Sequence, residues 1–273
     1  MNRRMNPTRA PRRRHTRADP ELPSLGSWVR RAREHRKLTR PRAAEFLHVS
    51  TDLLKKIERD EIPCSPAVLG NMTTAYGLDD AQRRYTHDLS QPPVPLSTVA
   101  ELRSWAGTPE HRAKLDYLDR RDLIGAYIDP LWNVVLSNPR FRTALPGVER
   151  FGDNIALWFF HPGSHARTAE TLVLHWDSAA AYLVASLRGA FGRHRDTPHA
   201  RTLYQELRRA DTFTRLWDTR LSVAYGVRTE QPVHLRDPTT GQPYAAHIHL
   251  GAQGTPDLHL CFAYRDPADR PPP

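Results

Sequence analysis

The sequence has little of what marks a secreted, membrane-spanning or disulfide-rich protein. Its two cysteines, Cys64 and Cys261, stand far apart in the chain and do not make the framework of a disulfide-stapled fold. No apolar run approaches the roughly 18 residues that a membrane-spanning helix needs. No apolar segment follows the charged N-terminus, so we expect no secretory signal, no membrane association and a cytoplasmic location.

Motifs of catalysis and nucleotide binding are also absent. The chain has no phosphate-binding loop, no dinucleotide fingerprint, no nucleophile elbow and no paired carboxylate motif. We therefore predict no cofactor and no catalytic residue set. An enzyme built on this chain would depend on the shape of a pocket and on one or two titrating groups. The candidates for such groups are His161, His165, His175 and His194.

Positive charge, by contrast, is in excess. Lysine and arginine number 40 against 30 aspartates and glutamates, which favours an anionic partner such as nucleic acid. An arginine-rich but otherwise ordinary protein would show the same balance. Residues 1–23 are rich in arginine and hold almost nothing apolar, so we predict a disordered basic arm. Such an arm could follow a phosphate backbone or remain a solvated tail.

Residues 24–89 carry the pattern of five short helices around one apolar centre. The most informative stretch is 39–59, which we interpret as helix, tight turn, helix. Thr39 and Ser50 stand where the two N-caps are needed. The buried side of the second helix is formed by apolar residues at helical spacing, namely Leu53, Leu54 and Ile57.

The opposite side of that second helix is cationic and rich in hydrogen-bonding groups. It carries Ser50, Thr51, Asp52, Lys55, Lys56 and Arg59. A short helix that is buried on one side and polar on the other suits insertion into a DNA major groove. We therefore predict double-stranded DNA as a partner. The alternative interpretation is an ordinary helical hairpin with a solvated basic face.

The remainder of the chain has a different texture. Residues 90–97 contain three prolines and form a semi-rigid linker, residues 98–266 form a second domain, and residues 267–273 a loose tail. The predicted helices of the second domain cover about 98–121, 138–145, 154–160, 166–191 and 199–216. The predicted strands cover 123–128, 131–136, 232–236, 244–250 and 257–264. Strands at both ends with helices between them indicate an α+β domain.

Large aromatic and apolar residues recur along the second domain. Such residues line small-ligand sites, and they equally well form plain core. The candidates for a ligand pocket are Tyr127, Trp132, Leu157, Trp158, Phe159, Phe160, Trp176 and Tyr182. Asn138 is expected to cap the following helix instead of touching a ligand.

The last two strands contain three histidines and a cysteine. If the hairpin pairs His249 with His259, then His247 faces Cys261 and all four side chains could bind zinc. In the alternative register the apolar residues face inward and the histidines face solvent. We predict no metal site.

Two resemblances add to this interpretation. Residues 24–89 resemble the Xre/Cro-type helix-turn-helix through RRAREHRKLTRPRAAEFLHVSTDLLKKIERDEIPCSPAVLGNMTTAYGL. The whole chain resembles the MmyB-like regulators through YIDPLWNVVLSNPRF, DNIALWFFHP, HWDSAAAYLVASLRGAFGRH and LRRADTFTRLWDTRLSV. The resemblance implies an all-α five-helix helix-turn-helix domain followed by an α+β, PAS-like ligand-binding domain.

The resemblance also implies a function. The protein would be a homodimeric transcriptional regulator whose second domain senses a small, apolar molecule. Arg40 would clamp a phosphate, Lys56 or Arg59 would contact the DNA backbone, and Ser50, Thr51, Asp52 and Lys55 would lie near base edges.

Three departures from the family pattern affect the first domain. His48 and Asp60 stand where glycine is usual, and Ala43 stands where leucine is usual. They leave room for a domain that folds but binds DNA weakly, because positive φ then falls on residues with side chains and the core is thinner. The alternative function is a regulator-like scaffold that catalyses a cofactor-free cyclisation or isomerisation in secondary metabolism.

Overall fold

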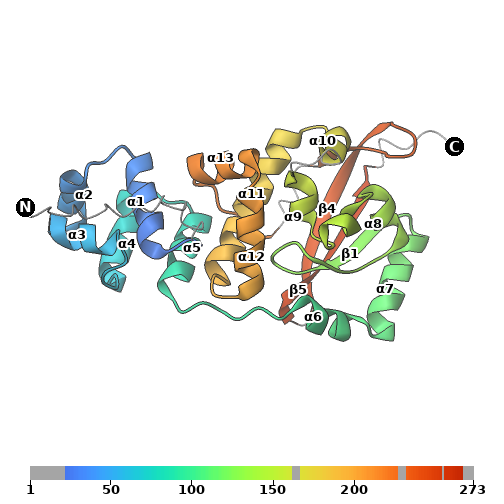
Figure 1. Cartoon of the computed structure of the whole chain (residues 1–273), viewed down its shortest axis with the longest axis horizontal. Coiled ribbons are helices and arrows are strands. Elements are labelled where there is room, and N and C mark those ends of the chain that lie inside the picture. The colour runs from blue at the N-terminus through green and yellow to red at the C-terminus, as the bar shows by residue number, and fades with distance from the viewer. Residues whose placement is uncertain (1–21, 162–166, 227–231, 254, 267–273) are drawn as a thin grey trace, which may run out of the picture.

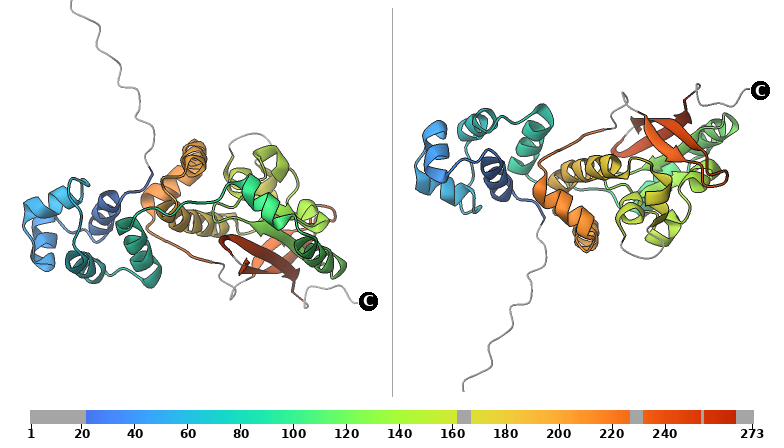
Figure 2. Two further views of the ribbon diagram at one scale, coloured as in Figure 1. Left: turned by 90° about the horizontal axis from the view of Figure 1, so that it is seen from below. Right: turned by 90° about the horizontal axis from the view of Figure 1, so that it is seen from above.

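The computed structural model describes residues 22–161, 167–226, 232–253 and 255–266. A bundle of short helices, α1 to α5, lies at one end of the molecule, and a sheet with its own helices lies at the other (Figure 1). Helices α11, α12 and α13 stand between them in all views (Figure 2). Most of the predicted arm at 1–23 and all of the predicted tail at 267–273 lie outside the described residues.

The helical part confirms the predicted order of five helices. They are α1 (Leu25–His35), α2 (Arg40–Leu47), α3 (Thr51–Ile57), α4 (Pro66–Ala75) and α5 (Asp80–Ser90). Thr39 accepts a hydrogen bond from the Arg42 amide and Ser50 accepts one from the Leu53 amide, so both predicted N-caps are confirmed. The apolar sides of the helices form one core, which includes Trp28, Leu47, Leu54, Met72 and Tyr85.

The three departures from the family pattern are all accommodated. His48 and Asp60 have positive φ, 54° and 55°, and Ala43 is completely buried. Asp60 compensates for its backbone with its side chain, which accepts hydrogen bonds from the Ser24 hydroxyl (2.6 Å) and the Gly26 amide (2.7 Å). A carboxylate at a helix N-terminus is favourable, so Asp60 ties α1 to the turn after α3.

This dual role of Asp60 makes a prediction. Asp60→Ala loses both hydrogen bonds and keeps the positive φ, so we expect the free energy of unfolding to fall by about 1–3 kcal/mol. Asp60→Gly loses the same bonds but relaxes the backbone, so it should be less destabilising by about 1 kcal/mol. Urea titration of the two variants checks this, and equal losses would show that φ costs nothing here.

The second domain is built on one antiparallel sheet with strand order β2-β1-β5-β4-β3. Its strands are β1 (Ile124–Ile128), β2 (Val134–Ser137), β3 (Val233–Arg236), β4 (Pro243–Gln253) and β5 (Thr255–Arg265). Its helices are α6 (Val99–Ala106), α7 (Pro109–Arg120), α8 (Pro139–Ala144), the 3-10 turn η1 (Val148–Phe151), α9 (Ile155–Phe160), α10 (Arg167–Leu172), α11 (Trp176–Arg193), α12 (Pro198–Leu207) and α13 (Asp211–Thr219). The predicted α+β architecture is confirmed.

The two faces of the sheet carry separate cores. Ala126 and Ile128 of β1 belong to the large cluster formed with α8, α9, α11, α12 and α13. Tyr127, between them, belongs to a smaller cluster with Leu102 of α6 and Leu115 of α7. This alternation follows from the two-residue period of a strand.

Three predicted long helices were wrong, because each is broken in two. The helix expected over 98–121 stops at Gly107, and Thr108 caps a new helix whose first residue is Pro109. The helix expected over 166–191 ends at Leu172, and the next residue, Val173, bridges to Leu235 of β3. The helix expected over 199–216 turns between Leu207 and Asp211. In the first case, a cap and a proline signal marked the break.

The candidate DNA-binding face and the aromatic core

Helix α3 presents the predicted polar face to solvent. Leu54 and Ile57 are buried, whereas the six predicted DNA-contact residues of this stretch are exposed: Ser50, Thr51, Asp52, Lys55, Lys56 and Arg59. The helix lies at the end of the molecule away from the sheet (Figure 1). Among the described residues, nothing from the second domain covers this face.

The cations of this face are available for a partner. Lys55 and Lys56 show no hydrogen bond or ion pair within the described parts of the chain. Arg59 lies 3.5 Å from Glu61, but both side chains are about half exposed, and exposed pairs of this kind contribute little. Two ammonium groups and one weakly held guanidinium therefore project from one short helix.

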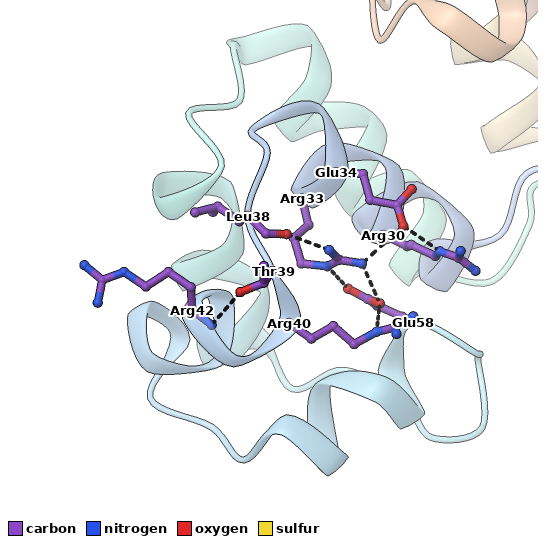
Figure 3. A network of polar contacts seen from close by, with 8 residues as sticks. All are labelled: Arg30, Arg33, Glu34, Leu38, Thr39, Arg40, Arg42 and Glu58. Atoms are coloured by element: carbon purple, nitrogen blue, oxygen red, sulfur yellow. Dashed lines mark hydrogen bonds and ion pairs between the residues drawn. The ribbon is translucent and has the colours of Figure 1, made fainter.

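Arg40, the predicted phosphate clamp, is part of a buried network (Figure 3). Its Nε donates to Glu58 Oε2 at 2.7 Å, and Arg33 donates to the same carboxylate through Nε at 2.5 Å and Nη2 at 3.2 Å. Arg33 Nη1 also donates to the Leu38 carbonyl. A phosphate contact by Arg40 must therefore use its Nη groups, since its Nε is engaged.

Glu58 was not identified from the sequence. Its side chain is fully buried between Arg33 and Arg40. Burial disfavours a charged Arg33, but the hydrogen bond from Glu58 and its charge outweigh burial and raise the pKa of Arg33. The available signal was opposite charge on the inner sides of α1 and α3. The network fixes the start of α2 against the end of α3, and thereby holds the DNA-contact face in shape.

The predicted pocket residues mostly converge in one aromatic core. Trp158 and Phe160 are buried in it, and Trp132, Leu157 and Trp176 pack against it. The ring of Phe159 stacks on that of Trp176 at 5.1 Å. Phe160 contacts Trp176 at 6.1 Å and Phe213 of α13 at 5.4 Å. Phe213 and its neighbour Trp217 were not among the predicted residues, although their helical spacing marks a buried face.

Two predicted pocket residues lie elsewhere. Tyr127 is on the other face of the sheet, where its ring contacts His111 at 5.1 Å. The hydroxyl of Tyr182 donates to the Gly226 carbonyl. The structure thus does not bring Tyr127 together with the others, because the predicted set ignored the alternation of side chains along β1.

The aromatic core is closed in this structure. Two surface hollows of about 520 and 730 Å³ are lined by other residues. Within the core, the Trp176 Nε1 is buried and has no hydrogen-bond partner among the described residues. A buried donor without an acceptor is costly, so this N–H is a place where a ligand oxygen would be stabilised.

The register of the last hairpin removes the zinc hypothesis. His249 pairs with Phe262, and His259 pairs with Ala252. His247 and His249 therefore share one face, where they stack on Tyr264 and Phe262, while His259 and Cys261 point to the other. The four side chains cannot converge on one ion.

The other candidate histidines are also separate. Burial lowers the pKa of His194, whose Nδ1 lies 2.9 Å from the Val94 carbonyl oxygen. His161 packs against Phe151, and His175 against His234. His165 lies outside the described residues. These contacts give no two of the described histidines a shared site.

Comparison with known families assigns both parts of the chain. A helix-turn-helix domain model matches residues 24–85, and the model of the MmyB-like transcription regulator ligand binding domain matches residues 111–271. No curated protein matches the sequence. The described helices include none with the length and hydropathy to cross a membrane. Because the second match covers more than half of the chain, the protein belongs to the MmyB-like transcription regulators, with a helix-turn-helix domain preceding its ligand-binding domain.

Proposed function

We propose that this regulator binds double-stranded DNA as a homodimer through the outer face of α3, and that a small apolar molecule in the aromatic core changes that binding. The observation that carries the proposal is the open, cationic face of α3. Its residue types suit the task, because lysine pairs with guanine, and serine and threonine pair with several bases. Asp52 can accept from a cytosine amino group or orient a neighbouring lysine.

The homodimer follows from the size of the module. One short recognition helix buries little DNA surface, and two half-sites multiply both affinity and specificity. Self-association is therefore expected to accompany DNA binding.

The ligand is proposed from the chemistry of the core. The rings of Phe159, Phe160, Trp176 and Phe213 would contact an apolar body, and the unpartnered Trp176 Nε1 would donate to one ligand oxygen. Because the core is closed, entry of a ligand has to move side chains. A ligand shifts an equilibrium only if it binds the two arrangements unequally, and a core that must rearrange meets this condition.

The test uses the full chain, DNA from upstream of its own coding sequence, and random DNA of equal length. We expect a salt-sensitive preference for the upstream DNA. The double variant Lys55→Ala, Lys56→Ala should weaken binding roughly tenfold or more, since a good base contact contributes about 1–3 kcal/mol. For each phosphate that the variant no longer neutralises, the slope of the salt dependence should also fall by about one unit.

The matched control removes two cations elsewhere. Arg83 of α5 pairs with Asp80 on the surface, and Lys114 of α7 donates to Gln253. The double variant Arg83→Ala, Lys114→Ala should keep the preference for upstream DNA. Equal losses in the two double variants would mean that net charge, and not the face of α3, determines binding.

A further inference from the structure

The two parts of the molecule share the segment 220–226, which follows α13. Leu221 and Val223 of this segment are buried in the core of the helical part. Gln82 of α5 donates to the Leu221 carbonyl at 3.3 Å, and the Tyr225 hydroxyl donates to Asp88 at 2.8 Å. The segment runs from α13 along the boundary of the two parts (Figure 2). A stretch of the second domain thus completes the core of the first.

The C-terminal end of α13 is clamped from both sides. The Trp217 carbonyl accepts from Arg31 of α1 at 2.5 Å and from Arg188 of α11 at 2.7 Å. Arg31 also donates to the carbonyls of Asp218 and Arg220, each at 3.2 Å. Carbonyls at a helix C-terminus carry partial negative charge and lack intrahelical partners, so they suit cations.

The clamp is electrostatically demanding. Burial lowers the pKa of Arg31, and it lowers that of Arg188 to about 10. In the described parts of the chain no carboxylate bonds to either guanidinium, and the nearby Asp218 is paired with Arg208. The two buried charges therefore depend on the backbone carbonyls at the end of α13. A displacement of this helix end would leave them unsatisfied, so its position is tightly specified.

The inner side of α13 reaches the aromatic core. Phe213 and Trp217 stack at 5.6 Å, and Phe213 contacts Phe160 at 5.4 Å. The Arg188 guanidinium lies 4.6 Å from the Trp217 ring centroid. One nine-residue helix thus touches the proposed ligand core with its rings and the helix-turn-helix domain with its last carbonyls.

Helix α11 provides a close-fitting seat for this junction. A Cβ on Gly192 would lie 2.2 Å from the Tyr85 ring of α5, and a Cβ on Gly189 would lie 3.0 Å from the Ala224 carbonyl oxygen. The absence of side chains at these two positions lets α5 and the segment 220–226 lie directly on α11. Such contact leaves little room for one part to move independently of the other.

We propose that α13 couples the packing of the aromatic core to the orientation of the helix-turn-helix domain, through the clamp on Arg31 and the segment 220–226. As a route of regulation this coupling rests on the proposed function. As a mechanical link it does not, and it can be tested without DNA and without ligand.

The test is hydrogen exchange of the full-length chain. Phe213→Leu loosens the contact of α13 with Phe160, and the amides of 220–226, including Ala224, should then exchange about tenfold faster or more. The matched control is Leu115→Ala in the core on the other face of the sheet, where a similar apolar volume is removed. In this control the segment should exchange as in the unaltered protein.

A second variant tests the clamp without disturbing the core. Arg31→Gln should speed exchange in 220–226 and leave α9 unchanged, whereas Arg30→Gln, next to it on the surface of α1, should change neither. If Arg31→Gln leaves the segment within about twofold of the unaltered protein, the clamp is not formed. If Phe213→Leu loosens α9 and α11 but not the segment, or Leu115→Ala loosens the segment equally, α13 does not carry the coupling. A failure to bind DNA would overturn the proposed function and leave these outcomes unaffected.

Discussion

Replacing Glu58 by alanine is expected to lower the free energy of unfolding of the helix-turn-helix domain by about 3–5 kcal/mol, the cost of leaving a buried charge without its partner. Glu58 accepts three hydrogen bonds from Arg33 and Arg40, and the Arg33 side chain is only 6% exposed. Arg33 cannot recover its hydration without disturbing the core. Urea unfolding of the full chain, followed by far-ultraviolet circular dichroism, measures the loss.

The control for this prediction is Glu45→Ala on the neighbouring helix. Glu45 pairs with Arg42 at 2.6 Å, but both side chains are more than 60% exposed, and an exposed pair contributes at most about 1 kcal/mol. If the two substitutions cost the same, the buried network does not stabilise the domain, and the positioning of α3 must be explained otherwise.

Phe160→Ala is expected to destabilise the second domain by about 3–5 kcal/mol, as other phenylalanine truncations in cores do. Phe160 is 5% exposed and contacts Phe159, Trp176 and Phe213. Truncation removes all three ring contacts and leaves a cavity beside the unpartnered Trp176 Nε1. Thermal unfolding of the full chain measures the effect.

Tyr117→Ala on α7 serves as the comparison, because this aromatic ring is 48% exposed and its removal should cost less than about 1 kcal/mol. Were Phe160→Ala as mild as Tyr117→Ala, the ring would not be held by its neighbours. The aromatic core would then already be loose enough to admit a ligand without rearrangement.

The helix-turn-helix could be predicted from the sequence because its signals are local. Thr39 and Ser50 cap helices that begin at the next residue, and Leu54 and Ile57 face inward because they are three residues apart on one helix. The compensation by Asp60 could not be predicted, since its partners Ser24 and Gly26 are more than thirty residues away in the chain.

The second domain was harder for the same reason. The order of strands and helices was correct, but the register of β4 and β5 depends on pairing along two eleven-residue strands. A shift in that register changes which histidines share a face. Tyr127 left the predicted pocket because a strand sends neighbouring side chains to opposite faces. The junction at Trp217 joins residues almost two hundred positions apart, and no local pattern marks it.

The DNA-binding role of α3 is tested most directly by hydrogen exchange of the full-length chain with and without the DNA upstream of its own coding sequence. We expect DNA to slow exchange of the amides at the start of α3, from Thr51 to Lys56, and at the start of α2 near Arg40. The sheet of the second domain should be unchanged. If α3 exchanged at the same rate with and without bound DNA, while another surface became protected, its outer face would not be the DNA-binding surface.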